Sequence, residues 1–292
     1  MFEGSTVAIV TPFKNGKVDE KKLKELVEFQ IKNGTSAILP CGTTGESATL
    51  TADEHDRVIE ICIEAAHKRV AVMAGTGSNS TQEAVALTQH AAKAGADASL
   101  QVSPYYNKPT QEGLYRHFKA VADSVSIPII LYNIAGRTAI NIEPETIARL
   151  ARDCKNIIGV KEASGSLDQM STIKTLCPKD FMLISGDDSL TLPILSIGGK
   201  GVISVVANIA PKDVADLCKA FDSGDLKKSQ ELHFKLLPLV KAMFYETNPI
   251  PVKTAMGLLG LCEPDLRLPL CSISEKNLER LKTALINYGL LK

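Results

Sequence analysis

The stretch NIIGVKEASG, residues 156–165, indicates the fold of this chain. Its apolar residues Ile157, Ile158 and Val160 form a short continuous run. Such a run is typical of a strand that is buried on both faces, as in a parallel sheet covered by helices. Lys161 follows directly, and an ammonium group at the end of a buried strand is costly to remove from water.

Three outcomes are open for Lys161. Its side chain can extend to solvent, or it can pair with a carboxylate. Glu162 is adjacent, but side chains alternate along a strand, so Glu162 points to the opposite face. The third outcome is functional, because a buried lysine whose pKa falls from about 10.4 towards about 7 to 8 attacks carbonyl carbons and forms a Schiff base.

Strand-like apolar runs recur along the chain, and each is followed by a segment with helical periodicity. The predicted strands cover residues 5–10, 36–39, 70–75, 98–102, 127–132, 157–160, 182–185 and 202–206. From residue 211 onward the strand signals stop and helical faces continue, with a break at Pro249 to Pro251.

Eight alternations of strand and helix predict an α/β protein, a closed (β/α)8 TIM barrel with a C-terminal helical extension. We expect the barrel to cover residues 1–223 and the helical appendage to cover 224–292, the two forming one structural unit. A doubly wound open sheet is the alternative. It is disfavoured because no G-x-G-x-x-G motif follows the first strand.

Several helix ends are marked in the sequence. Asp19 is the expected N-cap of the first helix, with Gly34 at its end. The pairs Thr51/Glu54 and Ser80/Glu83 have the spacing of capping boxes. These signals place the second and third helices directly after residues 51 and 80.

Composition restricts the class of partner. The chain has 292 residues, of which 45% are hydrophobic, and 33 basic residues balance 33 acidic ones. We therefore expect a small-molecule substrate and neither nucleic acid nor membrane as a partner. No apolar run approaches the roughly 20 residues of a membrane span, and no signal peptide is evident, which predicts a cytoplasmic protein.

Cysteine and histidine spacing gives no indication of a metal site. The seven cysteines contain no C-x-x-C pair, and H-E-x-x-H is absent. The pair Asp187-Asp188 raises the possibility of magnesium, but no second acidic cluster follows another strand, and a helix cap is the alternative role. We expect no metal.

Polar residues follow most of the predicted strands, where the functional groups of such barrels lie. The segment 42–45, GTTG, is either an anion-binding nest or an ordinary tight turn. Tyr106 and Tyr132 are either proton relays or structural tyrosines. Arg137, expected in a loop, is either a carboxylate clamp or a surface arginine. A lysine, two tyrosines, a threonine and an anion nest would suffice to bind a 2-oxo acid and react through an enamine without a cofactor.

Seven motifs resemble the family of dihydrodipicolinate synthases, also called 4-hydroxy-tetrahydrodipicolinate synthases, within the pyruvate-dependent class I aldolase and N-acetylneuraminate lyase superfamily. They are GTTGE (42–46), PYYNKP (104–109), YNIAGRT (132–138), GVKEASG (159–165), SGDD (185–188), GVIS (201–204) and NPIPVK (248–253). The likeness runs from Val7 to beyond Leu268 in the same order. Arg137 in its Y-N-x-x-x-R-T setting favours the synthases over the sugar-acid lyases.

The resemblance implies a lyase of diaminopimelate and lysine biosynthesis that condenses pyruvate with L-aspartate 4-semialdehyde to 4-hydroxy-tetrahydrodipicolinate. Lys161 would form the imine with pyruvate, with Tyr132 as the general acid and base. Thr43 would connect Tyr132 to Tyr106 in a proton relay. The implied substrate contacts are backbone groups of Thr43 and Thr44 for the pyruvate carboxylate, Arg137 for the carboxylate of the aldehyde, and the carbonyls of Gly186 and Ile203.

The resemblance also implies an oligomer, because the second tyrosine of these enzymes comes from a neighbouring subunit. We expect a homotetramer built as a dimer of dimers. Lysine is a possible allosteric effector, and the matching positions hold Ser47, Ala48, His55, Asn79, Glu83 and Tyr105. Ala52 replaces a histidine of some feedback-sensitive members, so we expect weak to moderate sensitivity.

Two other functions stay open. One keeps the Schiff base but cleaves a 2-keto-3-deoxy sugar acid or an N-acetylneuraminate-type substrate. The other is a non-catalytic barrel that senses a small anion at residues 42–45, although a pure binder has no use for a desolvated amine.

Overall fold

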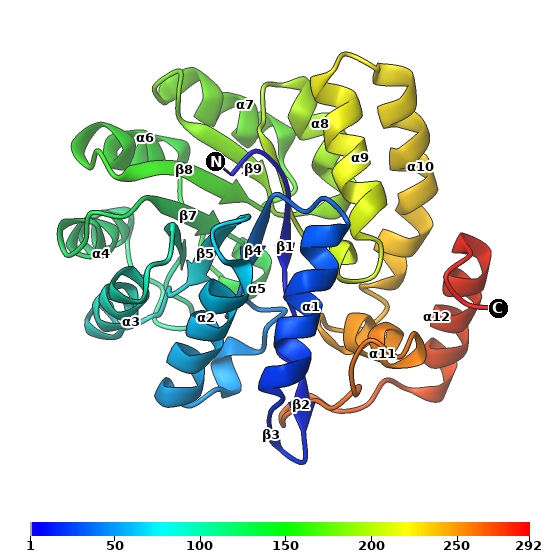
Figure 1. Ribbon diagram of the computed structural model, residues 1–292. Helices are drawn as coiled ribbons and strands as arrows, with labels where there is room; N and C mark the ends of the chain where they lie inside the picture. Colours follow the sequence, from blue (N-terminus) through cyan, green and yellow to red (C-terminus); the bar gives the residue numbers. More distant parts are fainter. Residues whose placement is uncertain (1) are drawn as a thin grey trace. The chain divides into compact units, whose positions relative to one another are not determined.

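The computed structural model describes residues 2–292 (Figure 1). Within these residues, eight parallel strands form a closed barrel in the order β1-β10-β9-β8-β7-β6-β5-β4. The strands are β1 (Gly4–Ala8), β4 (Ala37–Leu39), β5 (Ala71–Gly75), β6 (Ala98–Val102), β7 (Ile129–Asn133), β8 (Ile157–Glu162), β9 (Met182–Ser185) and β10 (Gly201–Ser204). The predicted (β/α)8 barrel is confirmed, and the doubly wound open sheet is excluded.

The chain divides into two compact units, Met1–Ala71 with Ser204–Lys292, and Val72–Ile203. In the first, α1 (Glu20–Lys32) packs on α2 (Ala52–Ala66), α9 (Pro211–Asp222) packs on α10 (Leu226–Ala242), and α12 (Glu275–Tyr288) contacts α10 and α11 (Ile250–Leu258) (Figure 1). The predicted C-terminal helices are therefore present, whereas a domain boundary at residue 223 stays a prediction.

The second unit carries α3 (Thr81–Ala94), α4 (Gln111–Asp123), α5 (Ala135–Thr138), α6 (Pro144–Asp153), α7 (Leu167–Leu176) and α8 (Thr191–Ser196). Figure 1 shows α3, α4, α6 and α7 following one another around the outside of β5 to β9, and consecutive helices contact each other. Buried side chains from these helices, such as Phe118 and Ile147, meet Ile129 and Leu183 of the strands. This apolar layer between helices and strands is the core of the unit.

Most helix signals are confirmed. Asp19 accepts a hydrogen bond from the Lys22 backbone N–H at 3.0 Å, and Thr51 and Glu54 form the full capping box. The second predicted box is half wrong. Ser80 accepts from the Glu83 backbone N–H, but the Glu83 carboxylate bonds the Ser78 hydroxyl instead of the backbone of Ser80.

The structure contains a hairpin that the periodicity did not indicate. Strands β2 (Phe13–Lys14) and β3 (Lys17–Val18) pair antiparallel across Asn15 and Gly16, which have φ values of +52° and +77°. An Asn-Gly pair with two positive φ angles is the preferred chemistry of a two-residue hairpin turn. The signal was therefore present in the sequence.

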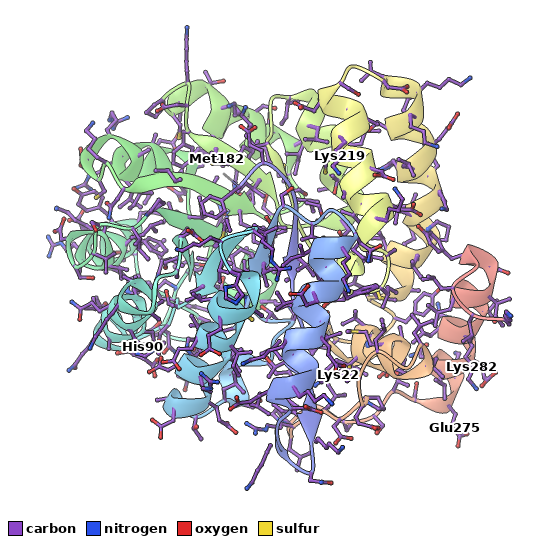
Figure 2. The ribbon with its side chains drawn as sticks, viewed as in Figure 1. Lys22, His90, Met182, Lys219, Glu275 and Lys282 are labelled. Carbon is purple, nitrogen blue, oxygen red and sulfur yellow. The ribbon has the colours of Figure 1, made fainter. Side chains whose placement is uncertain are left out.

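Charged side chains on the outer helices face solvent. Lys219 on α9 and Glu275 on α12 are two of these exposed residues (Figure 2). Within residues 2–292, no helix has both the length and the apolar character needed to span a bilayer.

Candidate active site

Lys161 and Tyr132 lie side by side on neighbouring strands. Strand β8 continues through Glu162, so Lys161 lies inside the strand and not just beyond it as predicted. In the register of β7 and β8, Tyr132 is opposite Lys161. The Lys161 Nζ atom is 4.1 Å from the centroid of the Tyr132 ring, and both side chains are 6% exposed. The structure thus places the Lys161 amine over the ring of Tyr132.

The surroundings of Lys161 lower its affinity for a proton. Burial lowers the pKa of Lys161 to about 7 because the ammonium form loses its hydration. The Asp188 carboxylate raises this pKa and the Arg137 guanidinium lowers it. The burial excludes a side chain that extends to solvent, and an amine with a pKa of about 7 is a nucleophile at neutral pH.

Gly186 follows β9 and leaves room for Lys161. A Cβ atom on Gly186 would lie 3.2 Å from Cε of Lys161 and 2.7 Å from Cβ of Ala163. The second distance is shorter than real Cβ contacts, so a larger residue would displace its neighbours. The Gly186 backbone N–H donates to the Glu162 carbonyl at 2.8 Å. Ile203, the other residue predicted to offer a carbonyl, is buried in β10.

Arg137 lies in the single-turn helix α5 and not in a loop as expected. Its side chain is exposed. The adjacent Thr138 is buried, accepts a hydrogen bond from the Ser103 hydroxyl at 3.3 Å, and donates to the Ile140 carbonyl at 3.0 Å. Thr138 therefore anchors the turn that carries the exposed Arg137.

Tyr106 has an unusual backbone and an exposed side chain. Its φ is +73°, and the side chain is 90% exposed. Hydrogen bonds on both sides hold the backbone: Asn79 Nδ2 donates to the Tyr105 carbonyl at 3.1 Å, and Asn107 Nδ2 donates to the Asn79 carbonyl at 2.9 Å. The phenol thus extends outward and does not pack against the buried Tyr132.

In the other unit, Thr43 and Thr44 lie in a tight turn. The backbone N–H groups of Gly45 and Glu46 donate to the carbonyls of Gly42 and Thr43, both at 3.1 Å. Among the described residues, the backbone N–H groups of Thr43 and Thr44 donate no hydrogen bond. Free N–H groups on neighbouring residues are what an anion-binding nest requires, and the nest at residues 42–45 stays a prediction.

The same turn is fastened to α11 by contacts that sequence reasoning missed. Asn248 Nδ2 donates to the Thr44 hydroxyl at 3.0 Å. Lys253 is fully buried, and its Nζ atom lies 2.7 Å from a Glu46 carboxylate oxygen and 2.9 Å from the Thr11 carbonyl. The available signal was a lysine between apolar neighbours in NPIPVK, a motif that we used only for the family resemblance.

The residues predicted to bind lysine fall in both units. In the first unit, Ser47 and Ala48 belong to a short 3-10 helix (Ser47–Thr49), and His55 is buried in α2. In the second, Asn79 contacts the backbone of Tyr105, and Glu83 lies exposed in the first turn of α3. The Glu83 backbone N–H donates to the Ser80 cap and its carboxylate accepts from the Ser78 hydroxyl, while its role as a ligand for lysine stays a prediction.

The acidic pair and the cysteines take structural positions. Asp187 caps the 3-10 helix Asp188–Leu190 through a hydrogen bond from the Ser189 N–H at 2.8 Å. Across residues 2–292, no group of three or more His, Cys, Asp or Glu side chains is arranged to hold a metal ion. The cysteines of this part of the chain are free thiols, and Cys271 alone among them is exposed.

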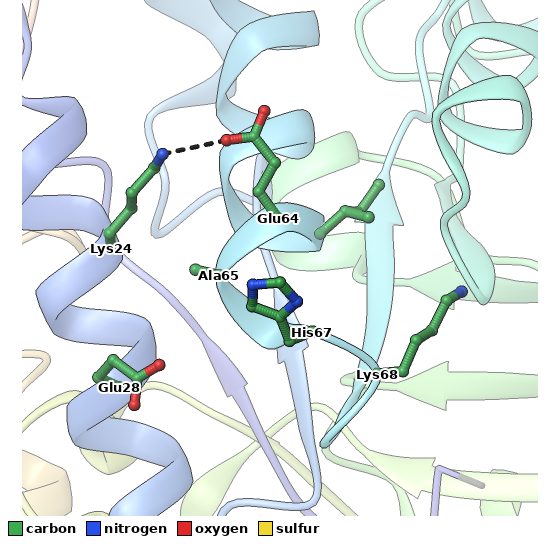
Figure 3. A pocket seen from close by; sticks show the side chains of 7 residues that line it. Lys24, Glu28, Glu64, Ala65, His67 and Lys68 are labelled. Atoms are coloured by element: carbon green, nitrogen blue, oxygen red, sulfur yellow. Dashed lines mark hydrogen bonds and ion pairs between the residues drawn. The ribbon is translucent and has the colours of Figure 1, made fainter.

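A surface cleft beside α1 and α2 contains none of the residues that the sequence predicted to be functional (Figure 3). The residues that line it are Lys24, Glu28, Ile63, Glu64, Ala65, His67 and Lys68. Lys24 pairs with Glu64 at 3.0 Å, and Glu28 pairs with Arg69. Because its two carboxylates are engaged by these exposed ion pairs, we assign no function to this cleft.

Comparisons with known proteins identify the family of this chain. The family described as Dihydrodipicolinate synthetase family matches residues 1–287. The 4-hydroxy-tetrahydrodipicolinate synthases of Endomicrobium trichonymphae and Syntrophus aciditrophicus are each 61% identical, over the full length of both chains. The crystal structure of dihydrodipicolinate synthase from Aquifex aeolicus superposes with a TM-score of 0.98 at 52% identity and covers 99% of each chain.

Two further similar structures are described with a bound molecule. The enzyme from Cyanidioschyzon merolae has lysine bound and superposes with a TM-score of 0.96 at 43% identity, with 99% of each chain covered. The enzyme from Acinetobacter baumannii is complexed with pyruvate and superposes with a TM-score of 0.97 at 44% identity, with each chain covered completely. With a family match over residues 1–287 and relatives at 61% identity, this chain belongs to the dihydrodipicolinate synthetase family.

Proposed function

We propose that this chain is a Schiff-base-forming lyase that condenses pyruvate with L-aspartate 4-semialdehyde to 4-hydroxy-tetrahydrodipicolinate, in diaminopimelate and lysine biosynthesis. The observation that carries the proposal is the buried Lys161, with a pKa lowered to about 7 by burial and its Nζ atom 4.1 Å from the Tyr132 ring centroid. The synthase name of relatives at 61% identity supports the choice of substrates.

The proposed reaction begins when the neutral Nζ atom attacks the ketone carbon of pyruvate. A carbon–nitrogen bond forms, and the ketone oxygen leaves as water with the two amine protons, which gives the imine. Protonation of the imine nitrogen and loss of a methyl proton then produce an enamine. Its carbon attacks the aldehyde carbon, and the aldehyde oxygen takes a proton. The amino group of the aldehyde substrate then attacks the carbon bonded to Lys161, so that a ring carbon–nitrogen bond forms, the bond to Nζ breaks, and the neutral Lys161 amine is released. Tyr132, adjacent to Nζ, is the proposed acid and base for these transfers.

The remaining substrate contacts and relay residues are proposed from the family resemblance. The free N–H groups of Thr43 and Thr44 support their role in holding the pyruvate carboxylate. The exposed guanidinium of Arg137 suits the carboxylate of the aldehyde. Thr43 would pass a proton between Tyr132 and Tyr106, while the carbonyls of Gly186 and Ile203 would orient the substrates.

The decisive experiment is borohydride reduction in the presence and absence of pyruvate, followed by peptide mass spectrometry. We expect a pyruvate-dependent adduct on Lys161 and none on the buried Lys253, with no adduct in Lys161→Ala. If Lys161 acquires no adduct, the Schiff-base mechanism is wrong. Parallel assays with aspartate semialdehyde and glyceraldehyde test the substrate, and a preference for glyceraldehyde would favour the sugar-acid aldolase instead.

We also propose that lysine is an effector of this enzyme and that the enzyme is a homotetramer. A related structure with lysine bound supports the effector. Because Ala52 stands where some sensitive members have histidine, we expect only weak to moderate inhibition at millimolar lysine. Unchanged activity under those conditions would contradict the effector role.

A further inference from the structure

A buried polar network lies next to Lys161 and Tyr132 in sequence but on the other face of the strands. Glu162 and Asn133 are both fully buried. Asn133 Nδ2 donates to both Glu162 carboxylate oxygens, at 3.0 and 3.3 Å. The carboxylate also accepts from the Ser164 backbone N–H at 2.7 Å and from Gln169 Nε2 at 3.2 Å.

The network continues into the loop after β7. Asn133 Nδ2 also donates to Asn141 Oδ1 at 2.7 Å, and Asn133 Oδ1 accepts from the Ile142 backbone N–H at 2.9 Å. Asn141 Nδ2 donates to Gln169 Oε1 at 2.9 Å. Residues 134–142, the segment that carries Arg137, are therefore tied at their far end to β7, β8 and α7.

The strand register connects this network to the proposed chemistry. Tyr132 pairs with Lys161, and the next residues along the two strands, Asn133 and Glu162, pair with each other. Side chains alternate along a strand, so the Tyr132–Lys161 pair and the Asn133–Glu162 pair lie on opposite faces of the two strands. Contacts that fix Asn133 against Glu162 on one face consequently fix Tyr132 against Lys161 on the other.

Stability alone gives no reason for a carboxylate here. Within residues 2–292, every hydrogen-bond partner of Glu162 is a neutral amide or backbone N–H, and Glu162 forms no ion pair. Burying a charge with neutral partners is costly, and apolar replacements of buried charged groups are often neutral or stabilising. An ionised carboxylate only accepts hydrogen bonds, however, and so it can accept from Asn133, Gln169 and Ser164 at the same time.

We propose that Glu162 is a positioning residue for the condensation. Its carboxylate holds β7 and β8 in the arrangement that sets Lys161 Nζ over Tyr132, and it anchors the segment that carries Arg137. This inference rests on the proposed function. It assigns Glu162 no contact with substrate.

The test is Glu162→Gln, which preserves shape but introduces a donor. Both carboxylate oxygens of Glu162 accept hydrogen bonds from N–H groups. In either orientation of the glutamine amide, its NH2 group therefore replaces one of these acceptors and faces a donor. We expect the folded variant to lose about tenfold to hundredfold in kcat and in the rate of pyruvate-dependent borohydride trapping, because small misplacements of reacting groups have effects of this size. The KM for pyruvate should change less than about threefold, since the proposed carboxylate site is at Thr43 and Thr44.

A charge-transposed variant and a matched control separate positioning from stability. Glu162→Gln with Asn133→Asp puts the carboxylate on β7 and the amide on β8, and it should recover most of the lost trapping rate. Thr88→Val alters another buried network of this unit, in which Thr88 bonds Thr76 at 2.9 Å and Gln101 at 2.8 Å. It should lower the Tm while leaving kcat within about twofold.

The outcomes distinguish this inference from the proposed function. Wild-type enzyme that forms no adduct overturns the proposed function and this inference with it. Normal trapping by folded Glu162→Gln, or an equal kcat loss in Thr88→Val at a matched Tm, overturns the positioning role alone. If the single variant does not fold, a folded double variant decides: trapping near the wild-type rate supports the role, and trapping lowered at least tenfold overturns it.

Discussion

Lys161 illustrates how burial can activate a side chain. A lysine with a pKa of about 10.4 is neutral in roughly one molecule in a few thousand at pH 7. Burial lowers the pKa of Lys161 to about 7, so about half of the molecules carry the free amine at neutral pH. The unprotonated fraction of the amine at pH 7 is therefore about a thousandfold larger, and no neighbouring general base is needed.

The pKa of Lys161 predicts a pH dependence for imine formation. Only the unprotonated amine attacks, so the trapping rate with pyruvate should rise about tenfold per pH unit below pH 7 and become constant above about pH 8. Asp188 raises this pKa, so Asp188→Asn should move the rise to lower pH. Arg137 lowers it, so Arg137→Gln should move the rise to higher pH.

Trapping rates measured between pH 5 and 9 without any aldehyde would check these shifts, because the proposed role of Arg137 in aldehyde binding then has no influence. Lys161→Ala gives the background of non-specific reduction. Shifts in the same direction for both variants would contradict the opposite charge effects of Asp188 and Arg137.

At the scale of elements, the turn at residues 42–46 depends on α11. Glu46 has a φ of +53°, and its carboxylate receives the Lys253 ammonium and the Arg267 backbone N–H at 3.1 Å. The Lys253 Nζ atom lies 4.2 Å from the Phe13 ring centroid, and the Arg267 Cζ atom lies 4.4 Å from it. Burial lowers the pKa of Lys253, and the Glu46 carboxylate opposes that effect. The helical C-terminal segment thus shapes the turn that holds Thr43 and Thr44.

We expect Lys253→Met to lower the free energy of unfolding by about 3 to 5 kcal/mol, because removal of one partner leaves a buried charge uncompensated. The double variant Lys253→Met with Glu46→Gln should recover a substantial part of the lost free energy of unfolding, since both charges are then absent. Urea denaturation of the three variants, including Glu46→Gln alone, measures the coupling. A double variant whose loss equals the sum of the single losses would show that the ion pair contributes no coupling.

At the scale of the whole molecule, the proposed oligomer gives the exposed Tyr106 a role in a site shared between subunits. A phenol that is 90% exposed on a backbone held by Asn79 and Asn107 makes few contacts in its own chain. A proton-relay residue needs a hydrogen-bonded neighbour. In the proposed oligomer, that neighbour is supplied by the site of the adjacent subunit.

Subunit mixing tests this arrangement. In a heterodimer of Lys161→Ala and Tyr106→Phe, one site regains both wild-type residues if Tyr106 acts across the interface. Random mixing should then restore about one quarter of the wild-type activity. The control pair Lys161→Ala and Tyr132→Phe shows no recovery, because both residues belong to the same chain's site. If the mixture of Lys161→Ala and Tyr106→Phe has only the summed activity of the two separate variants, Tyr106 acts in the site of its own subunit.

The sequence predicted the residues of the Lys161–Tyr132 pair because strand periodicity is local. Hydrophobic runs located the barrel strands to within a few residues, and cap residues such as Asp19 and Thr51 located helix starts. The Asn15-Gly16 hairpin was equally readable and was overlooked. Arg137 was expected in a loop, since four residues are too few to show a helical period.

The barrel, the family resemblance and the candidate nucleophile could all be predicted before folding was considered, because each depends on residue type and short-range spacing. Their surroundings depend on contacts that folding makes between distant parts of the chain. Glu46 meets Lys253 across 207 positions, and Asn133 meets Glu162 across 29, so no local pattern records either contact. The pKa of Lys161 likewise depends on burial and on charges brought close by folding, and NIIGVKEASG alone contains neither.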